Sequence, residues 1–185
     1  SRLTVLVALG THAPMSEDDR RAMVGVDLPV LNHEWWDDGT FVTLGTIDAG
    51  DIAQLSGGRL AEDVEIRVNR RVVESDVTLI VGPVLPHEVV GFSGGNKYLF
   101  PGVSGQEVID VSHWLGALIT SAEIIGVRGT APVRALIDEA AALVPGERHA
   151  LCVVTRSGTH DADDGLAGSE QPDPSAAHAG AGVAL

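Results

Sequence analysis

The sequence is short of several residue types, and each shortage excludes a class of protein. Among 185 residues there is one cysteine, Cys152, so the chain forms no internal disulfide and is typical of a reducing compartment. Its apolar runs are far shorter than the roughly 20 residues of a membrane-spanning helix. The start of the chain does not have the pattern of a secretory signal peptide. We therefore expect a cytoplasmic protein with no membrane partner.

Basic residues are also few. The chain has 12 lysines and arginines against 26 aspartates and glutamates, which gives a formal net charge of −14. Such a surface repels the phosphates of nucleic acid, so we exclude nucleic acid as a partner. A small anionic substrate is not excluded, because it responds to the local field of a cleft rather than to the net charge.

What the chain does contain is an alternation of strand-like and helix-like segments. Continuous apolar runs at 3–9 and 77–81 have the length and composition of strands that are covered on both faces. Further strands are expected at 30–34, 41–46, 64–68 and 149–155, and helices after Ser16, over 106–118 and over 133–144. The sequence therefore predicts an α/β fold, a Rossmann-like layered sheet that is mostly parallel with helices on both faces.

Residues 1–156 form the predicted domain. The chain enters a buried-type strand within a few residues of Ser1, so we expect it to be truncated at its N-terminus; a complete domain that opens on a central strand is the alternative. Residues 157–185 are rich in Gly, Ala, Asp, Pro and Ser, and we expect a loop or the partly disordered start of the next segment. Within it, residues 175–185 are expected to begin a helix. These patterns do not define an oligomeric state.

Residues 82–113, GPVLPHEVVGFSGGNKYLFPGVSGQEVIDVSH, concentrate the chemistry of the chain. They contain Lys97, the single lysine among the 12 basic residues. An arginine guanidinium stays protonated, whereas a lysine can act as a neutral amine nucleophile and form amide-type or Schiff-base links. Gly94 and Gly95 precede it in a turn that allows the backbone to approach a ligand closely. The turn is not a phosphate-binding P-loop, because the lysine does not directly follow a glycine and no serine or threonine follows it.

Histidines occupy the ends of predicted elements. His12 follows the first strand, His87 follows the strand at 77–81, and His113 lies in the predicted helix at 106–118. Because parallel strands present their carboxyl ends at one edge, His12 and His87 are expected to face each other across a cleft. Two imidazoles with pKa values near neutrality can act as general acid and general base on opposite sides of a substrate carbon, as racemisation requires. For each of them a hydrogen-bonded structural role is the alternative. That structural role is the one we assign to His33, His149, His160 and His178.

The segments 8–19, ALGTHAPMSEDD, and 86–113, PHEVVGFSGGNKYLFPGVSGQEVIDVSH, resemble the N-terminal domain of the nickel-pincer lactate racemase family. The resemblance covers roughly residues 3–130, and its most specific part is the block that carries His87, Lys97 and His113. It implies a nickel-pincer nucleotide cofactor, pyridinium-3-thioamide-5-thiocarboxylic acid mononucleotide with bound nickel. The cofactor would be tethered through a thioamide to Lys97, in the loop that Gly94 and Gly95 form.

The resemblance further implies a racemase or epimerase of 2-hydroxy acids. His113 matches the protein ligand to nickel, and imidazole suits this metal. His12 and His87 match the acid and base that act on the 2-hydroxyl group. Hydride would leave carbon 2 of the substrate for the cofactor, and its return to the other face would invert the centre. The implied partners are a small 2-hydroxy acid and the proteins that make the cofactor.

The chain departs from the family pattern at both ends. It starts after an Asp-x-x-Arg-Pro-type motif, and it stops before a second domain that supplies a lysine to the substrate carboxylate. We therefore expect the 185-residue chain to be inactive alone. Two other functions stay open. One is a lyase or aldolase in which Lys97 forms a Schiff base, and the other is a non-catalytic metal-binding or interaction domain of the same fold.

Overall fold

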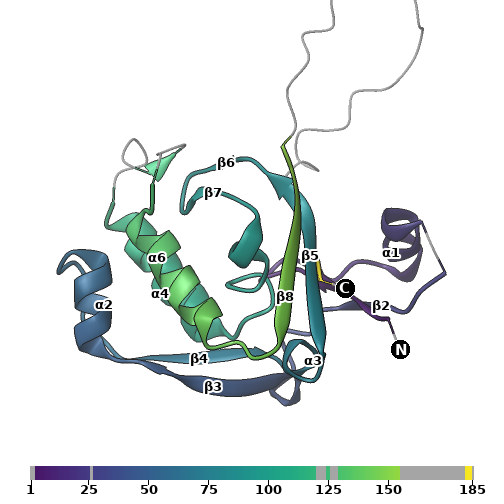
Figure 1. Ribbon diagram of the computed structural model, residues 1–185, viewed down its shortest axis with the longest axis horizontal. Coiled ribbons are helices and arrows are strands. Elements are labelled where there is room, and N and C mark those ends of the chain that lie inside the picture. Colours follow the sequence, from purple (N-terminus) through teal and green to yellow (C-terminus); the bar gives the residue numbers. More distant parts are fainter. Residues whose placement is uncertain (1–2, 26, 120–123, 126–128, 155–181, 185) are drawn as a thin grey trace, which may run out of the picture.

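A mixed, mostly parallel sheet forms one layer of the molecule (Figure 1). The structure is a computed structural model and describes residues 3–25, 27–119, 124–125, 129–154 and 182–184. The strand order is β2-β1-β9-β5-β8, with the bounds β1 Val5–Ala8, β2 Val30–Asn32, β5 Val77–Val84, β8 Glu147–Val154 and β9 Gly182–Ala184. β1 pairs in parallel with β2, and β5 with β8, whereas β9 lies antiparallel between β1 and β5. The predicted α/β class with a mostly parallel sheet is confirmed.

The second layer consists of helices that pack between this sheet and a separate hairpin (Figure 1). This hairpin consists of β3 (Phe41–Ile47) and β4 (Val64–Asn69), which pair antiparallel and have α2 between them in the chain. Helix α4 (Gln106–Ala117) packs on β4 and on α6 (Pro132–Ala142), and α6 contacts the 3-10 helix η2 (Gly95–Tyr98), which in turn contacts β5. Shorter elements are α1 Glu17–Val24 beside β2, α2 Ala49–Ser56 beside α6, α3 Arg70–Val73, the 3-10 helix η1 Asp38–Thr40, β6 Pro86–His87 and β7 Gly91–Phe92.

Local chemistry explains where the helices begin and end. The Ser16 hydroxyl accepts a hydrogen bond from the backbone N–H of Asp19 at 3.1 Å, so Ser16 is the N-cap of α1, as the sequence predicts. Asp48 caps α2 in the same way, through the N–H of Asp51 at 2.9 Å. Pro132 stands in the first turn of α6, where its missing N–H has no partner to lose. None of the described helices is long and apolar enough to cross a bilayer.

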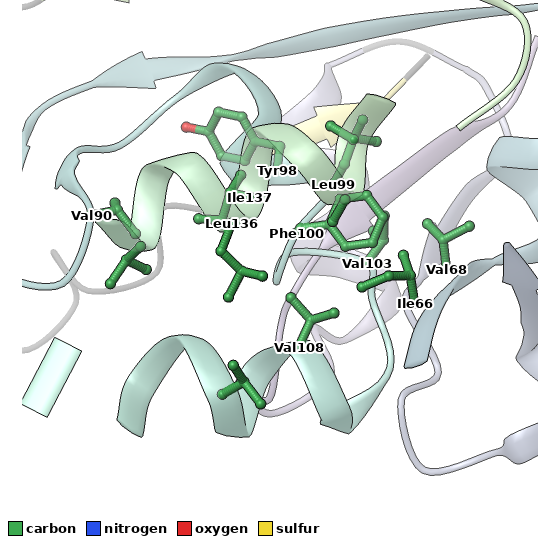
Figure 2. Packing of buried hydrophobic residues seen from close by; sticks show 14 of the residues in the cluster. Ile66, Val68, Val90, Tyr98, Leu99, Phe100, Val103, Val108, Leu136 and Ile137 are labelled. Atoms are coloured by element: carbon green, nitrogen blue, oxygen red, sulfur yellow. The ribbon is translucent and has the colours of Figure 1, made fainter. Parts of the chain in front are cut away.

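The hydrophobic core lies between the helices, η2 and the strands that face them. Leu99 and Phe100, which directly follow η2, are fully buried, and Figure 2 shows them among side chains of β4, α4 and α6. The labelled side chains around them are Ile66 and Val68 of β4, Val108 of α4, and Leu136 and Ile137 of α6. The chain segment that carries Lys97 is therefore continuous with the core.

Two sequence predictions about strands are wrong. Strand β5 does not end at Gly82 but continues to Val84, because residues 82–84 pair in parallel with residues 152–154 of β8. Gly82 also leaves room for the ring of Tyr98, since a Cβ on Gly82 would lie 2.3 Å from the Tyr98 hydroxyl. Strand β5 is also less covered than its apolar sequence suggests, since Val77 is 47% exposed and only Thr78 and Ile80 of the run 77–81 are buried.

The helix predicted at 175–185 is wrong where the structure describes the chain. Gly182–Ala184 forms β9, which bonds to both β1 and β5. A strand at this place supplies backbone partners to two strands at once, and glycines are poor helix formers. The loop predicted for residues 157–174 and the domain boundary predicted at residue 156 lie outside the described residues, so both stay predictions.

A buried histidine links the five-stranded sheet to the β3–β4 pair. His33 follows β2 and has no exposed surface. Its Nδ1 accepts from the Asn69 side-chain amide at 3.1 Å, so its Nε2–H donates to the carbonyl of Ser104 at 3.3 Å. Burial lowers the pKa of His33 to about 4, and the hydrogen bond to Ser104 opposes the shift. The structural role predicted for His33 is confirmed, because both ring nitrogens are satisfied with the ring neutral.

This buried ring makes the stability of the fold depend on pH. The pKa of His33 is lower in the folded chain, about 4, than its ordinary 6.5, so the unfolded chain binds more protons below pH 6.5. The free energy of unfolding is expected to fall by about 3 kcal/mol as the pH drops from 7 to 4. Below pH 4 the titration of His33 should change it little further. Urea unfolding followed by tryptophan fluorescence measures this slope.

The substitution His33→Gln isolates the effect from the titration of carboxylates. The variant is expected to be less stable at pH 7, yet to lose less stability than the parent between pH 6.5 and 4. His149→Gln is the matched control, because the side chain of His149 is 58% exposed. Equal pH slopes for the parent and His33→Gln would contradict the assignment.

Candidate functional site

Lys97 follows a turn, residues 93–95, that is hydrogen-bonded to the chain just after β5. Ser93 exchanges hydrogen bonds with Leu85, through its N–H to the Leu85 carbonyl at 2.8 Å and through its hydroxyl, which accepts from the Leu85 N–H at 2.9 Å. Gly94 adopts φ +87°, and a Cβ there would lie 2.6 Å from Cγ2 of Val84. Only glycine therefore allows the backbone to turn this close to β5 before it enters η2.

The Lys97 amine lies at the border between the core and the surface. Its neighbours Tyr98 and Leu99 are buried, and Lys97 itself is half-buried. Burial lowers the pKa of Lys97 below its ordinary value; the positive charge of Arg134 lowers the pKa further, and the carboxylate of Glu88 opposes both. A lowered pKa increases the neutral fraction of the amine, which is the nucleophilic form.

His87 lies in β6, at the far side of the turn. Its Nδ1 accepts a hydrogen bond from the N–H of Val89 at 3.1 Å, so in the neutral ring the proton is on Nε2. Burial lowers the pKa of His87, and the charge of Lys97 is the next cause; Glu88 raises it, and His113 also lowers it. In this arrangement the Nε2–H of neutral His87 can donate a hydrogen bond.

His113 lies on α4 and has the opposite tautomer. Its Nδ1 is 2.7 Å from the carbonyl oxygen of Ile109, one turn earlier, and because a carbonyl only accepts, Nδ1 carries the proton. The lone pair of Nε2 is then free to bind a metal, and a carbonyl partner at the other nitrogen is the usual way to orient a metal-binding imidazole.

His12 lies on the exposed loop that follows β1. The loop is held against the segment after Lys97, because the N–H of Gly10 donates to the carbonyl of Gly102 at 2.8 Å. On its other side, the indole N–H of Trp35 donates to the carbonyl of His12 at 3.2 Å. The backbone of His12 is thus placed by partners from two other parts of the chain.

The structure brings His87, Lys97 and His113 within electrostatic range of one another, since the charges of the last two act on the pKa of His87. Their predicted roles, and that of His12, stay predictions. Among the described residues, no group of three or more His, Cys, Asp or Glu side chains could hold a metal ion.

Sequence reasoning missed two residues of this region, Arg134 and Asp138 of α6. The Arg134 guanidinium donates to the carbonyls of Phe92 and Gly94, and Asp138 accepts from the Asn96 side chain at 2.9 Å. Their spacing of four residues, which puts them on one helix face, is the signal in the sequence. It does not say which loop the face meets, about 40 residues earlier in the chain.

The other predicted structural histidines give a mixed outcome. The exposed ring of His149 on β8 contacts the carboxylate of Glu147 at 2.7 Å, which agrees with a surface role. His160 and His178 lie outside the described residues.

Fold and site together define a layered α/β domain that presents an amine and imidazoles beside a glycine turn. The family model described as the lactate racemase N-terminal domain matches residues 1–126, and the chain belongs to that family. The lactate racemase of Lactiplantibacillus plantarum is 26% identical over 117 residues, 61% of this chain and 24% of that protein. That of Thermoanaerobacterium thermosaccharolyticum is 27% identical over the same shares. The chain thus spans about a quarter of the length of the curated relatives it matches.

Solved structures agree on the fold. A crystal structure of a protein from Thermotoga maritima superposes with a TM-score of 0.76 at 29% identity, covering 83% of this chain and 39% of that one. The lactate racemase apoprotein of Thermoanaerobacterium thermosaccharolyticum gives a TM-score of 0.64 at 21% identity, covering 82% and 34%. At that identity the second likeness concerns the fold alone.

The two candidate glycines provide a matched test of the turn. Gly95 has φ +56° with open space around its Cβ position, so Gly95→Ala is expected to cost only the left-handed backbone strain, ~1–2 kcal/mol. Gly94→Ala adds a clash with Val84 and is expected to cost clearly more, by a further ~1–3 kcal/mol. Urea unfolding measures both. Equal losses for the two variants would show that the turn does not pack against β5 as described.

Proposed function

We propose that this chain is the lysine-bearing domain of a racemase or epimerase that acts on 2-hydroxy acids with a nickel-pincer nucleotide. The observation that carries the proposal is the half-buried Lys97 amine, with its lowered pKa, in electrostatic range of His87 in a member of the lactate racemase N-terminal domain family. A small 2-hydroxy acid is the proposed substrate. The proteins that make the cofactor are the proposed partners, and the cytoplasm is the proposed location.

The residues present suit such a cofactor. Lys97 offers a neutral amine for a thioamide link, and Gly94 and Gly95 keep side chains away from the backbone beside it. His113 offers the free Nε2 lone pair that nickel accepts. When bound, the nickel-pincer cofactor would supply the acceptor for the hydride on carbon 2 of the substrate.

Proton transfer falls to the imidazoles. When both of its ring nitrogens are protonated, His87 would donate the Nε2 proton to the oxygen on carbon 2 as the hydroxyl forms, and the neutral ring that remains can accept from the N–H of Val89 at Nδ1. His12, on the loop after β1, is the proposed partner that accepts the hydroxyl proton from the other side. The two rings exchange roles when the reaction runs in reverse, because the ring that accepts a proton in one direction donates it in the other.

A Schiff-base lyase is the second candidate, since the lowered pKa of Lys97 equally favours attack on a carbonyl carbon. Borohydride separates the two functions. It traps an imine at Lys97 when a carbonyl substrate is added, whereas a thioamide link forms no reducible imine. The third candidate, a non-catalytic metal-binding or interaction domain of the same fold, requires no modification of Lys97.

Intact mass spectrometry with metal analysis tests the proposal on protein produced together with the cofactor-making enzymes. We expect a mass adduct on Lys97 and nickel near one equivalent. Lys97→Arg is expected to lose both, because a guanidinium cannot be thioacylated in this way. His113→Ala is expected to keep the adduct and lose most of the nickel. Turnover is not the readout, because the chain spans about a quarter of its curated relatives. Unmodified, nickel-free parent protein would refute the proposal.

A further inference from the structure

We propose that Arg134 and Asp138 of α6 are positioning residues that hold the loop 92–97 and thereby set both the placement and the reactivity of the Lys97 amine. The inference relies on the proposed function only for the identity of the group that Lys97 would carry. It concerns a face of α6 whose contacts serve neither the helix itself nor the hydrophobic core.

Arg134 holds the first half of the loop. Its guanidinium donates to the carbonyl of Phe92 through one terminal nitrogen and to that of Gly94, at 3.4 Å, through the other. These two carbonyls flank Ser93, which is bonded to β5 on the opposite side. The planar guanidinium can span two acceptors with its own nitrogens held in one plane, which the point charge of a lysine cannot do.

Asp138 holds the second half. Its carboxylate accepts from the side-chain amide of Asn96 at 2.9 Å, one helical turn beyond Arg134. Asn96 precedes Lys97, and the N–H of Lys97 donates to the carbonyl of Gly94 at 3.3 Å, the same carbonyl that Arg134 contacts. Helix α6 therefore bonds to the loop on both sides of Gly95, and the backbone N–H of Lys97 donates to the carbonyl of Gly94 that Arg134 also contacts.

Electrostatics supports the geometry. The charged groups that act on Lys97 come from two elements: Arg134 from α6, which lowers the pKa of the amine, and Glu88 from the turn between β6 and β7, which raises it. The ring of His87 on β6 is in range as well, because its own pKa responds to Lys97. Arg134 is half-buried, and burial lowers its pKa too; its charge acts on both Lys97 and His87, although Glu88 has the larger effect on each.

A single lysine makes the inference directly measurable. The apoprotein is treated with the N-hydroxysuccinimide ester of acetic acid over a range of pH, and acetylation of Lys97 is followed by mass spectrometry. The amine lone pair attacks the ester carbonyl carbon, a C–N bond forms, the C–O bond to N-hydroxysuccinimide breaks, and the amine proton passes to buffer. The rate against pH gives the apparent pKa of the amine, and its plateau at high pH gives accessibility.

Loss of the Arg134 charge is expected to make Lys97 less reactive. In Arg134→Gln the apparent pKa of Lys97 should rise, so labelling at pH 8 should be slower than in the parent protein. The plateau at high pH should stay the same or increase, since the loop is less tightly held. Arg21→Gln on α1 is the control, because Arg21 is 71% exposed and pairs with Glu17 at the surface.

Loss of the Asp138 acceptor is expected to loosen the loop without removing the positive charge. In Asp138→Ala the amides of residues 95–97 should exchange with deuterium several-fold faster than in the parent protein. Glu139→Ala removes the same charge from the next, exposed position of α6 and should leave the exchange unchanged.

Two outcomes would overturn the inference. One is an unchanged apparent pKa with equal or faster labelling at pH 8 in Arg134→Gln, which would mean that Arg134 only fills space. The other is identical exchange in Asp138→Ala and Glu139→Ala. If Arg134→Gln does not fold, the Asp138 pair decides alone. Neither outcome touches the cofactor adduct and nickel content that test the proposed function.

Discussion

Burial of the segment that directly follows Lys97 is the constraint on which the site depends. Tyr98, Leu99 and Phe100 are 6%, 0% and 0% exposed, and burying three such side chains contributes on the order of 6 kcal/mol. This gain exceeds the cost of keeping one half-buried amine beside them, because the amine retains a path to solvent and can lose its proton. Lys97 is therefore held at the border of the core by its neighbours, and it cannot move outward without exposing an aromatic ring.

The local charge balance of the site differs from that of the whole chain. The net charge is −14, yet Lys97 and Arg134 both act on His87 in one small region, where the carboxylate of Glu88 is the opposing charge. Salt screens charges that lie more than about 10 Å apart in solvent, so the distant carboxylates do little to change this local balance. A small anion can respond to the two local cations, whereas the acidic surface as a whole repels a polyanion such as nucleic acid.

Sequence patterns predicted the elements well where they depend on local chemistry. The helix start at Ser16 and the helices predicted over 106–118 and 133–144 each agree with the observed elements α1, α4 and α6 to within a few residues. The errors come from contacts between distant parts of the chain. The sequence predicts a strand end at Gly82, but β5 continues through it in pairing with β8, and Gly182–Ala184 forms a strand that bonds to both β1 and β5.

The same distinction applies to the site. The chemical character of Lys97, His87 and His113 could be inferred from residue type and motif, since an amine and an imidazole keep their reactivity in any fold. The tautomers could not, because they are set by Val89 and Ile109, whose backbone groups meet the rings only after the turn and the helix have formed. The role of α6 could not be predicted either, since Arg134 looks like any surface arginine until its loop is known.

The repulsion between neighbouring cationic groups also indicates what kind of ligand the site would bind. Burial and mutual repulsion lower the pKa values of Lys97 and His87, so the folded chain is less stable when these groups are protonated. A bound anion offsets this repulsion, as a phosphate or a carboxylate would, and its binding to the folded state alone stabilises the fold by mass action. A mononucleotide and a 2-hydroxy acid each carry such an anion. Burial is the first cause of the lowered pKa of Lys97, and the positive charge of Arg134 adds to it; the same positive charge would favour the anionic molecules proposed to bind here.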